Sequence, residues 1–472
     1  MSQEAAVSRR IPRHNTLQHW ALHGSDRRVR GGTERALGPA VQVPDGKRWG
    51  RSRRATVKPD DARPPVAEVD FAAAPFLVIW ETTRACDLSC RHCRAEAVPC
   101  RDPAELNTLE AMRLMNEVRQ FGKPLFVLTG GDPLKRDDVV DLVAHGARLG
   151  LRVAMTPSGT PLMTPEVLRR LRDAGLGRLA VSLDGSTAEI HDAFRGVAGS
   201  YAWTLRMLDA ARELGLSTQV NTTVGRHNLE DFDRLCDLMT GLGIVLWSVF
   251  FLVPTGRARP EDLASAEEFE AVFHKMYELA RTAPFDIKST AAPQYRRVLL
   301  QRQVGERRAG SREQAPAPLT AAGFSLGDGV GRAKGVNDGD GFVFISHTGE
   351  IVPSGFLPLS AGNVRSDDVV QVYRESPLFR GLRDRSLLKG KCGVCEYVDV
   401  CGGSRARAYA LTGDYLEAEP FCTHVPARYR RLVEAGEAEP VTEYFARRVA
   451  GRRRPLPTFP AANHHLNQRE LP

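Results

Sequence analysis

The stretch FLVIWETTRACDLSCRHC, residues 76–93, joins a short apolar run to three closely spaced cysteines. The run FLVIW (76–80) is short, apolar and rich in branched and aromatic side chains, a pattern typical of a buried β-strand. Cys86, Cys90 and Cys93 follow in a CxxxCxxC pattern. A closed structural metal site usually has four protein ligands. This loop therefore places three thiols at a strand end and leaves a fourth ligand to be found.

The composition is that of a soluble globular protein. The chain has 472 residues, of which 42% are hydrophobic and 26% charged, and a chain of this length holds two or three domains. It has no apolar run long enough to span a membrane and no secretory signal, so we expect a cytoplasmic protein. In that reducing compartment the nine cysteines are expected to be metal ligands or redox groups rather than disulfides.

Most of the net positive charge lies in the first 70 residues. They contain 14 Lys and Arg against 8 Asp and Glu, a net of +6 out of the chain's +8. Nothing in this segment repeats or alternates with aromatic residues in a binding pattern. A solvated, disordered extension is therefore favoured over a segment that binds nucleic acid.

Six strand-like runs alternate with helical periodicity. The runs occupy 76–80, 125–129, 152–156, 178–184, 217–224 and 244–251. The first helix is expected to start at a capping box formed by Asn107 and Glu110. Six successive strand–helix units indicate an α/β fold with a parallel sheet and helices outside. Six are too few for a closed eight-fold barrel and favour an open or partial (βα)6 barrel of the TIM type.

We accordingly divide the chain into five parts. These are a basic extension (1–70), the partial barrel (71–302), a linker or mobile insertion (303–340), a small cysteine-bearing domain (341–430) and a polar tail (431–472). The proposed linker is rich in Gly, Arg, Ala and Pro, which is typical of irregular segments.

The three-cysteine loop lies where barrels place their chemistry, at the C-terminal end of a strand. Three thiolates can hold three irons of a [4Fe–4S] cluster and leave one iron with open coordination. The alternative is a zinc site completed by His92 or by a distant cysteine. Adjacent His92 and Cys93 cannot easily bind one tetrahedral zinc together, and structural zinc sites usually combine two ligand pairs. An open cluster is therefore favoured.

The loop and the strand-end motifs TGGDP (129–133), TPSG (156–159), SLDG (182–185) and HDAFRG (191–196) resemble the radical SAM superfamily, over residues 72–430. The resemblance implies that S-adenosylmethionine (SAM) is the missing ligand of the open iron. It also implies that reductive cleavage of SAM yields a 5′-deoxyadenosyl radical, which abstracts hydrogen from the substrate. A flavodoxin- or ferredoxin-type partner would supply the electron.

The same resemblance implies a set of SAM-binding residues. The backbone of the GGDP segment would receive the SAM amino group, Ser182 and Asp184 the ribose, Arg195 the SAM carboxylate and His92 the adenine. The full set is His92, Gly130, Gly131, Asp132, Pro133, Ser158, Ser182, Asp184, Arg195 and Asn221. Structural roles stay open for three of these features: GGDP as a plain turn, Asp184 as a cap of its own backbone, and Arg195 as a surface salt bridge.

A second, four-ligand set consists of Cys392, Cys395, Cys401 and Cys422. The spacing alone suits either a Cys₄ zinc site or an iron–sulfur cluster. It resembles the SPASM domain of radical SAM enzymes, which implies one auxiliary [4Fe–4S] cluster. Arg405 stands where a complete SPASM domain has a further cysteine, and the upstream segment offers only Ser354. We therefore expect a reduced, twitch-like domain without the inner auxiliary cluster.

Residues 392–415 resemble radical SAM enzymes of haem and haem d1 biosynthesis. Among these are haem b synthases, which convert two propionates of iron-coproporphyrin III to vinyl groups. The resemblance implies a porphyrin substrate, and Arg405 and Arg407 are suited to bind its carboxylates. As alternatives they are helix-surface arginines or salt bridges within the domain. A ribosomal-peptide maturase is the second functional hypothesis. A non-catalytic metal protein that binds nucleic acid through its basic tails is a remote third.

Overall fold

The computed structural model describes residues 70–308 and 335–450. The predicted basic extension up to residue 69, most of the predicted linker and the end of the predicted tail lie outside these ranges. The five-part division of the chain stays a prediction. No helix in the described part of the chain is both long enough and apolar enough to cross a membrane.

The described residues are organised by one ten-stranded sheet, in the order β10-β9-β8-β1-β2-β3-β4-β5-β6-β7. Strands β8 and β1 to β7 run parallel to one another, and β9 and β10 continue the sheet as antiparallel strands beyond β8. The strands are β1 (Leu77–Glu81), β2 (Leu125–Thr129), β3 (Arg152–Met155), β4 (Arg178–Ser182), β5 (Ser217–Val224), β6 (Leu246–Phe251), β7 (Asp286–Thr290), β8 (Phe342–Ile345), β9 (Glu350–Val352) and β10 (Gly362–Asn363).

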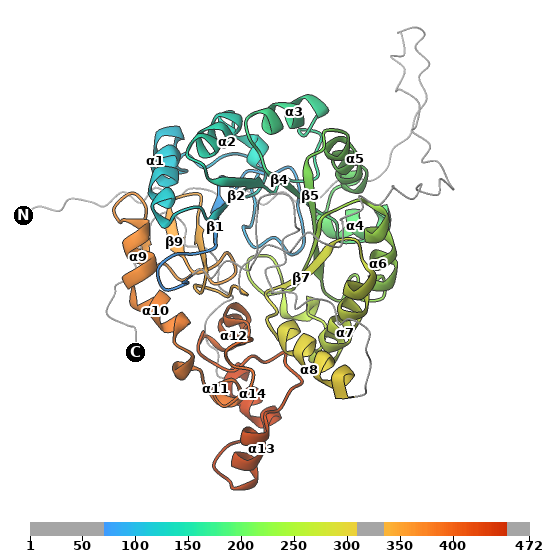
Figure 1. Ribbon diagram of the computed structural model, residues 1–472, viewed down its shortest axis with the longest axis vertical. Coiled ribbons are helices and arrows are strands. Elements are labelled where there is room, and N and C mark those ends of the chain that lie inside the picture. Colours follow the sequence, from blue (N-terminus) through green and yellow to red (C-terminus); the bar gives the residue numbers. More distant parts are fainter. Residues whose placement is uncertain (1–69, 309–334, 451–472) are drawn as a thin grey trace, which may run out of the picture. The chain divides into compact units, whose positions relative to one another are not determined.

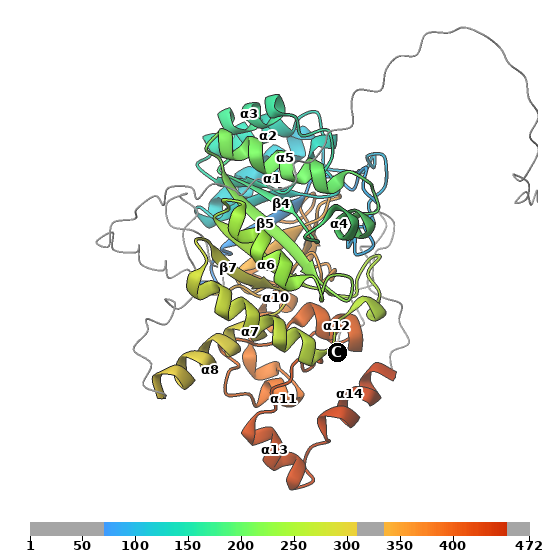
Figure 2. The ribbon, with the colours of Figure 1, turned by 90° about the vertical axis from the view of Figure 1, so that its right-hand side faces the viewer.

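Helices α1 to α8 surround the outer side of this sheet, and the later helices lie beside its open edge (Figure 1). Figure 2 shows α3 at the top of the described structure and α13 and α14 in its lower part. The α-helices are α1 (Thr108–Val118), α2 (Val139–Arg148), α3 (Pro165–Asp173), α4 (Ala188–Arg195), α5 (Ser200–Glu213), α6 (Phe232–Gly241), α7 (Ala266–Thr282), α8 (Gln294–Arg308), α9 (Val369–Glu375), α10 (Pro377–Arg383), α11 (Gly390–Gly393), α12 (Arg405–Thr412), α13 (Ala427–Glu434) and α14 (Val441–Ala450). Four 3₁₀ turns complete the set: η1 (Arg119–Phe121), η2 (Pro133–Lys135), η3 (Pro260–Asp262) and η4 (Arg385–Leu387).

The six predicted strands are confirmed, and so is the capping box of Asn107 and Glu110 at the start of α1. The sheet is longer than predicted, because β7 and β8 also run parallel to their neighbours. Strand β7, DIKST, is polar except for Ile287 and lacks the apolar run by which strands were identified. Strand β8 was assigned to the small C-terminal domain, yet it pairs with β1 and so extends the barrel sheet.

Alternate residues of β1 face opposite sides of the sheet, as in any strand. Val78 and Trp80 belong to the large core beneath the helices. Ile79 packs with Phe344 of β8 in a separate apolar cluster on the inner side. Glu81 lies on the same side of β1 as Ile79. Its carboxylate therefore lies on the inner side of the sheet, at the C-terminal end of the strand.

Burial in the outer core predicts that two leucines of α1 contribute very differently to the free energy of unfolding. Leu114 is 1% exposed and Leu109 is 78% exposed. Leu114→Ala removes buried methyl groups and leaves a cavity, and we expect it to lower the free energy of unfolding by about 2–5 kcal/mol. Leu109→Ala serves as the matched control and should change it by less than about 0.5 kcal/mol. Anaerobic urea titration of both variants measures this, and equal midpoints would contradict the assigned core face.

Candidate functional site

The three-cysteine loop begins after β1 and is tied to the ends of β2 and β3. The Cys86 N–H donates to the carbonyl oxygen of Val98 over 2.8 Å, which closes the loop on itself. Ser158, which follows β3, places its Oγ 3.2 Å from Cys86 Sγ. The same hydroxyl lies 2.7 Å from the carbonyl oxygen of Gly131, to which it donates. The structure thus brings together three of the predicted site residues.

The sulfur atoms of this loop receive backbone N–H groups. The Leu88 N–H donates to Cys86 Sγ over 3.3 Å, and the Ala97 N–H donates to Cys93 Sγ over 3.4 Å. Burial raises the pKa of the Cys86 thiol to about 11, because the buried thiolate loses its hydration. A coordinated metal deprotonates such a thiol outright. Buried sulfurs with aimed N–H donors therefore suit thiolate ligands of a metal centre.

The two glycines after β2 lie against the backbone that precedes the cysteine loop. A Cβ atom on Gly130 would lie 2.3 Å from the Thr83 oxygen, and one on Gly131 would lie 2.3 Å from the Ala85 oxygen. The Gly131 N–H donates to Thr83 and the Asp132 N–H donates to Ala85, each over 2.7 Å. Because side chains would force these backbones apart, the segment is more than a plain turn.

Asp132 uses its carboxylate to hold the chain itself. The group is fully buried and accepts the Leu134 N–H over 3.1 Å, the Ser158 N–H over 3.4 Å and the Thr160 hydroxyl over 2.9 Å. Pro133 opens the short turn η2 that this carboxylate caps. Any contact between this segment and a ligand therefore falls to its backbone, as the resemblance implies.

Arg195 and Asp184 form a buried ion pair beside the second cysteine. Arg195 also lies with Nη1 3.7 Å from Cys90 Sγ, while Asp184 accepts the Thr223 N–H over 2.7 Å. Burial would lower the pKa of Arg195, but the Asp184 carboxylate and the Cys90 sulfur outweigh it and raise that pKa. The structure thus favours a salt bridge for Arg195, although a buried one, and Asp184 caps a neighbouring strand rather than its own turn.

Ser182 and Asn221 lie opposite each other in the pairing of β4 with β5. Their strand neighbours Val181 and Val220 belong to the helix-facing core, so both polar side chains point to the inner side. Gln219 donates to the Asn221 side-chain oxygen over 2.7 Å. These two residues stay predicted ligand contacts.

His92 belongs to a stack of three rings that the sequence did not reveal. Its ring centroid lies 4.2 Å from that of Phe194, which lies 3.4 Å from that of His227 on its other face. Four buried atoms have no hydrogen-bond partner among the described residues: Nδ1 of His92, Nε2 of His227, and Nε and Nη2 of Arg257. Burial lowers the pKa of His227 to about 3 and that of His92 well below its usual value, so both rings are neutral.

Buried polar atoms of this kind are destabilising unless something satisfies them. Four such atoms gathered beside the cysteine loop are suited to bind a polar ligand. His227 follows β5 and Arg257 follows β6, so the signal that could have found both residues was their place after strand ends.

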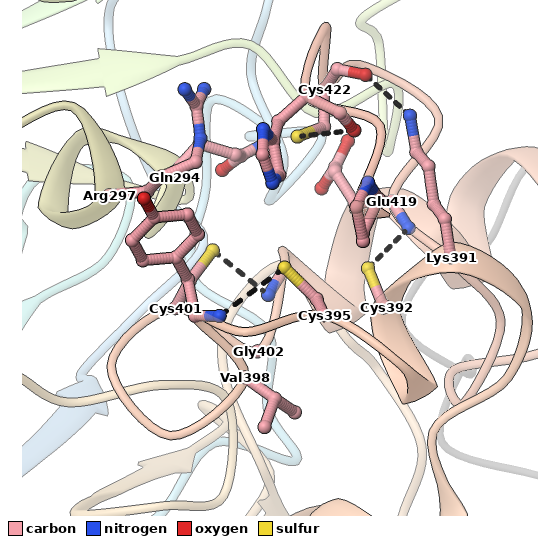
Figure 3. Close-up of a pocket in the computed structure, with 14 residues that line it drawn as sticks. Gln294, Arg297, Lys391, Cys392, Cys395, Val398, Cys401, Gly402, Glu419 and Cys422 are labelled. Carbon is pink, nitrogen blue, oxygen red and sulfur yellow. Dashed lines mark hydrogen bonds between the residues drawn. The ribbon is translucent and has the colours of Figure 1, made fainter. Parts of the chain in front are cut away.

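The four C-terminal cysteines line one pocket together with Lys391, Arg297, Glu419 and His424. Figure 3 shows Cys392, Cys395, Cys401 and Cys422 around this shared space. Three of the four sulfurs accept a backbone N–H: Cys392 from Glu419 over 3.3 Å, Cys395 from Tyr397 over 3.5 Å, and Cys401 from Gly403 over 3.5 Å. Burial raises the pKa of Cys401 to about 12 and that of Cys422 to about 11. This donor set also suits thiolate ligands.

The spacing of these sulfurs bears on which metal they fit. A tetrahedral zinc with four thiolates holds its sulfurs about 3.8 Å apart. Among the described residues, the metal-binding group whose ligand atoms all lie within 4.8 Å of one another is Cys395, Glu396 and His424, and no three of the four cysteines form such a group. The auxiliary iron–sulfur cluster at these four cysteines stays a prediction.

Arg405 and Arg407 are not available to a substrate, so the expectation that they receive substrate carboxylates is wrong. Both are fully buried. Arg405 donates to the carbonyl oxygens of Tyr415 and Glu417 over 3.0 and 2.8 Å. The Arg407 guanidinium lies 3.3 Å from the carboxylate of Glu419, so the alternative of an internal salt bridge is correct for Arg407.

The Arg407 guanidinium also joins the C-terminal domain to the barrel. It donates to the carbonyl oxygens of Leu252, Phe251 and Ala291 over 3.2, 3.0 and 2.9 Å. Those carbonyls lie at the C-terminal ends of β6 and β7. The side chain therefore acts as a structural link between the two parts.

Known proteins resemble this chain in sequence and in fold. A family model described as the radical SAM superfamily matches residues 80–239. The AdoMet-dependent heme synthase of Methanosarcina barkeri is 41% identical over 355 residues, which cover 75% of this chain and 98% of that protein. The mycofactocin maturase MftC of Mycobacterium ulcerans is 31% identical over 356 residues, covering 74% and 88%. The structure of Streptococcus suis SuiB bound to S-adenosylmethionine shares the fold, with a TM-score of 0.54 at 16% identity over 75% of this chain and 78% of that one.

The close approach at Gly131 predicts a selective loss at the three-cysteine loop. In Gly131→Ala the new Cβ would collide with the Ala85 backbone, so we expect less iron per chain and little SAM cleavage after anaerobic reconstitution. Gly241→Ala is the control, because a Cβ on Gly241 meets no atom within 4 Å. Iron, sulfide and 5′-deoxyadenosine assays measure the difference, and normal values for Gly131→Ala would refute the argument.

The buried link at Arg407 predicts a loss of stability rather than of substrate affinity. Arg407→Met leaves the Glu419 carboxylate buried and unpaired, which should lower the free energy of unfolding by about 3–5 kcal/mol. Arg430→Met, at an exposed position of α13, should change it by less than about 0.5 kcal/mol. Urea titration compares the two variants. If Arg407→Met instead unfolds like the wild type, Arg407 is not the link described above.

Proposed function

This chain belongs to the radical SAM superfamily, and we propose that it oxidatively decarboxylates propionate side chains of a haem precursor, with iron-coproporphyrin III as the substrate. The observation that carries the proposal is the 41% identity to a heme synthase over 98% of that relative's length. The mycofactocin maturase is 31% identical over a similar share of the chain. The hypothesis of a haem-precursor substrate therefore has more support than that of a peptide substrate.

Cys86, Cys90 and Cys93 would hold the [4Fe–4S] cluster of the family. With SAM bound, this centre would supply the hydrogen-abstracting radical chemistry of the family. Loss of one hydrogen atom, CO₂ and one electron from a propionate would leave a vinyl group. The chain's own residues position these groups: Ser158 joins the Cys86 sulfur to the Gly131 carbonyl, and the Arg195 guanidinium lies beside the Cys90 sulfur. The buried polar atoms of His92, His227 and Arg257 that have no hydrogen-bond partner among the described residues would serve as donors and acceptors for SAM.

Cys392, Cys395, Cys401 and Cys422 would hold one auxiliary [4Fe–4S] cluster. The N–H groups aimed at three of these sulfurs support thiolate ligands, and the resemblance to SPASM domains favours a cluster over zinc. We infer that this site accepts the electron released with CO₂. A flavodoxin- or ferredoxin-type donor would supply the electron that SAM cleavage consumes.

The inner side of the sheet offers an apolar wall for a macrocycle. Phe344 and Ile79 form one apolar cluster there. Phe250 lies between Val249 and Phe251, which face the helices, so its ring points inward. It lies 6.3 Å from the ring of Phe356. Aromatic and aliphatic walls with few polar groups are typical of sites that bind flat organic ligands.

The second candidate is a maturase of ribosomal peptides, favoured by the 31% identity to the mycofactocin maturase. If the substrate were a peptide, the enzyme would leave the mass of an added porphyrin unchanged. Both candidates share the radical chemistry, so the substrate assay must separate them.

We expect the anaerobically reconstituted protein, given SAM, reductant and iron-coproporphyrin III, to yield 5′-deoxyadenosine together with porphyrins that have lost one and then two carboxyl groups. Mass spectrometry follows both products. Cys90→Ala should abolish both, and Cys395→Ala should lower porphyrin conversion more than 5′-deoxyadenosine. Cys236→Ala, on α6 and distant in sequence from both cysteine sets, is the matched control. Formation of 5′-deoxyadenosine with unchanged porphyrin would overturn the haem assignment and favour peptides.

A further inference from the structure

Glu81, at the C-terminal end of β1, holds a histidine that the proposed function does not use. Its carboxylate is fully buried, with Oε1 2.8 Å from Nδ1 of His347 and Oε2 2.7 Å from Nη1 of Arg94. Burial alone would raise the pKa of Glu81, but Arg94 and His347 together outweigh it and lower that pKa. The carboxylate is therefore ionised and accepts a hydrogen bond, so Nδ1 of His347 carries the proton.

The fold brings this histidine to the inner side of the barrel sheet. His347 lies in the turn between β8 and β9, and β8 is the parallel neighbour of β1. Glu81 is on the same side of β1 as Ile79. The Arg94 guanidinium lies 4.4 Å from the ring of Phe344, on that same inner side. Arg94 follows directly after the ligand Cys93, so the group lies next to the radical-generating loop.

The second ring nitrogen of His347 is left for a ligand. With the proton on Nδ1, Nε2 carries the lone pair and points away from Glu81. It makes no hydrogen bond to any residue that the structure describes, although the side chain is only 4% exposed. A histidine whose one nitrogen donates to a carboxylate while the other is free is the usual arrangement of a metal-binding histidine. The carboxylate orients the ring and makes the free nitrogen a stronger ligand.

We propose that Nε2 of His347 is an axial ligand to the iron of a metalloporphyrin substrate. This inference rests on the proposed function, and it adds how the enzyme selects and orients that substrate. One iron–nitrogen bond fixes the macrocycle by its centre, which leaves its peripheral propionates to reach the cysteine loop. It also makes the enzyme prefer the iron-loaded porphyrin over the metal-free one. A purely structural role of the Glu81, Arg94 and His347 group would require neither property.

The test is resonance Raman spectroscopy of the reconstituted protein with ferrous iron-coproporphyrin III, excited in the porphyrin band. We expect an iron–histidine stretching band in the wild type, lost in His347→Ala and regained as an iron–imidazole band on addition of imidazole. Glu81→Gln should move the band to lower frequency and weaken binding by about 10–100-fold. His145→Ala, on α2 at the outer side, is the matched control. Titration with metal-free coproporphyrin III should show no difference between wild type and His347→Ala.

Two outcomes would overturn the inference in different ways. A wild-type complex without an iron–histidine band, or a band that persists in His347→Ala, refutes the axial ligand while the haem assignment stands. Failure of the wild-type protein to bind iron-coproporphyrin III at all refutes the proposed function together with the inference. A wild-type spectrum without the band refutes the axial ligand whatever His347→Ala does, and the return of an iron–imidazole band on addition of imidazole shows that His347→Ala is folded.

Discussion

The backbones of Thr83–Ala85 and Gly130–Asp132 lie against each other beyond the ends of β1 and β2. The pairing begins in the strands, where Glu81 is opposite Thr129, and continues through hydrogen bonds of 2.7 Å into both loops. Only glycine permits this approach, because a Cβ would fall on a carbonyl oxygen. The position of Cys86 is thereby fixed against the ends of β2 and β3. The cysteine sulfurs and their polar neighbours are placed relative to one another through this contact.

Local sequence patterns were enough to predict those features that are determined by a few neighbouring residues. Apolar runs located six strands, because each run lies within a few neighbouring residues. Cysteine spacing predicted two metal-ligand sets from equally local signals. Strand β7 was missed because Ile287 is the one apolar residue in DIKST. Strand β8 was assigned to another domain because its partner β1 lies far away in the chain. The pairing of Glu81 with His347, which joins residues 266 positions apart, follows from that same long-range contact and has no counterpart in the sequence pattern.

Arg405 and Arg407 show how burial changes the meaning of a residue. Beside a cysteine ligand in the sequence, an arginine resembles a group that recognises carboxylates. In the structure Arg407 is fully buried, and its donors are taken by three backbone carbonyls and the Glu419 carboxylate. Removing so much hydration from a guanidinium is tolerated only where such partners replace the water. The unpartnered atoms of Arg257 mark the opposite case, since no group in the described part of the chain replaces their water.

The Glu419–Arg407 pair connects the two metal-ligand sets through the barrel. Glu419 donates its N–H to the sulfur of Cys392 and pairs with Arg407, which in turn binds carbonyls at the ends of β6 and β7. The three-cysteine loop lies at the same C-terminal ends of the parallel strands. Both cysteine sets are thus anchored to one rigid sheet, so the distance between them is set by strand register rather than by a flexible linker. The proposed radical source and the proposed electron acceptor would therefore be held at a fixed separation by the sheet.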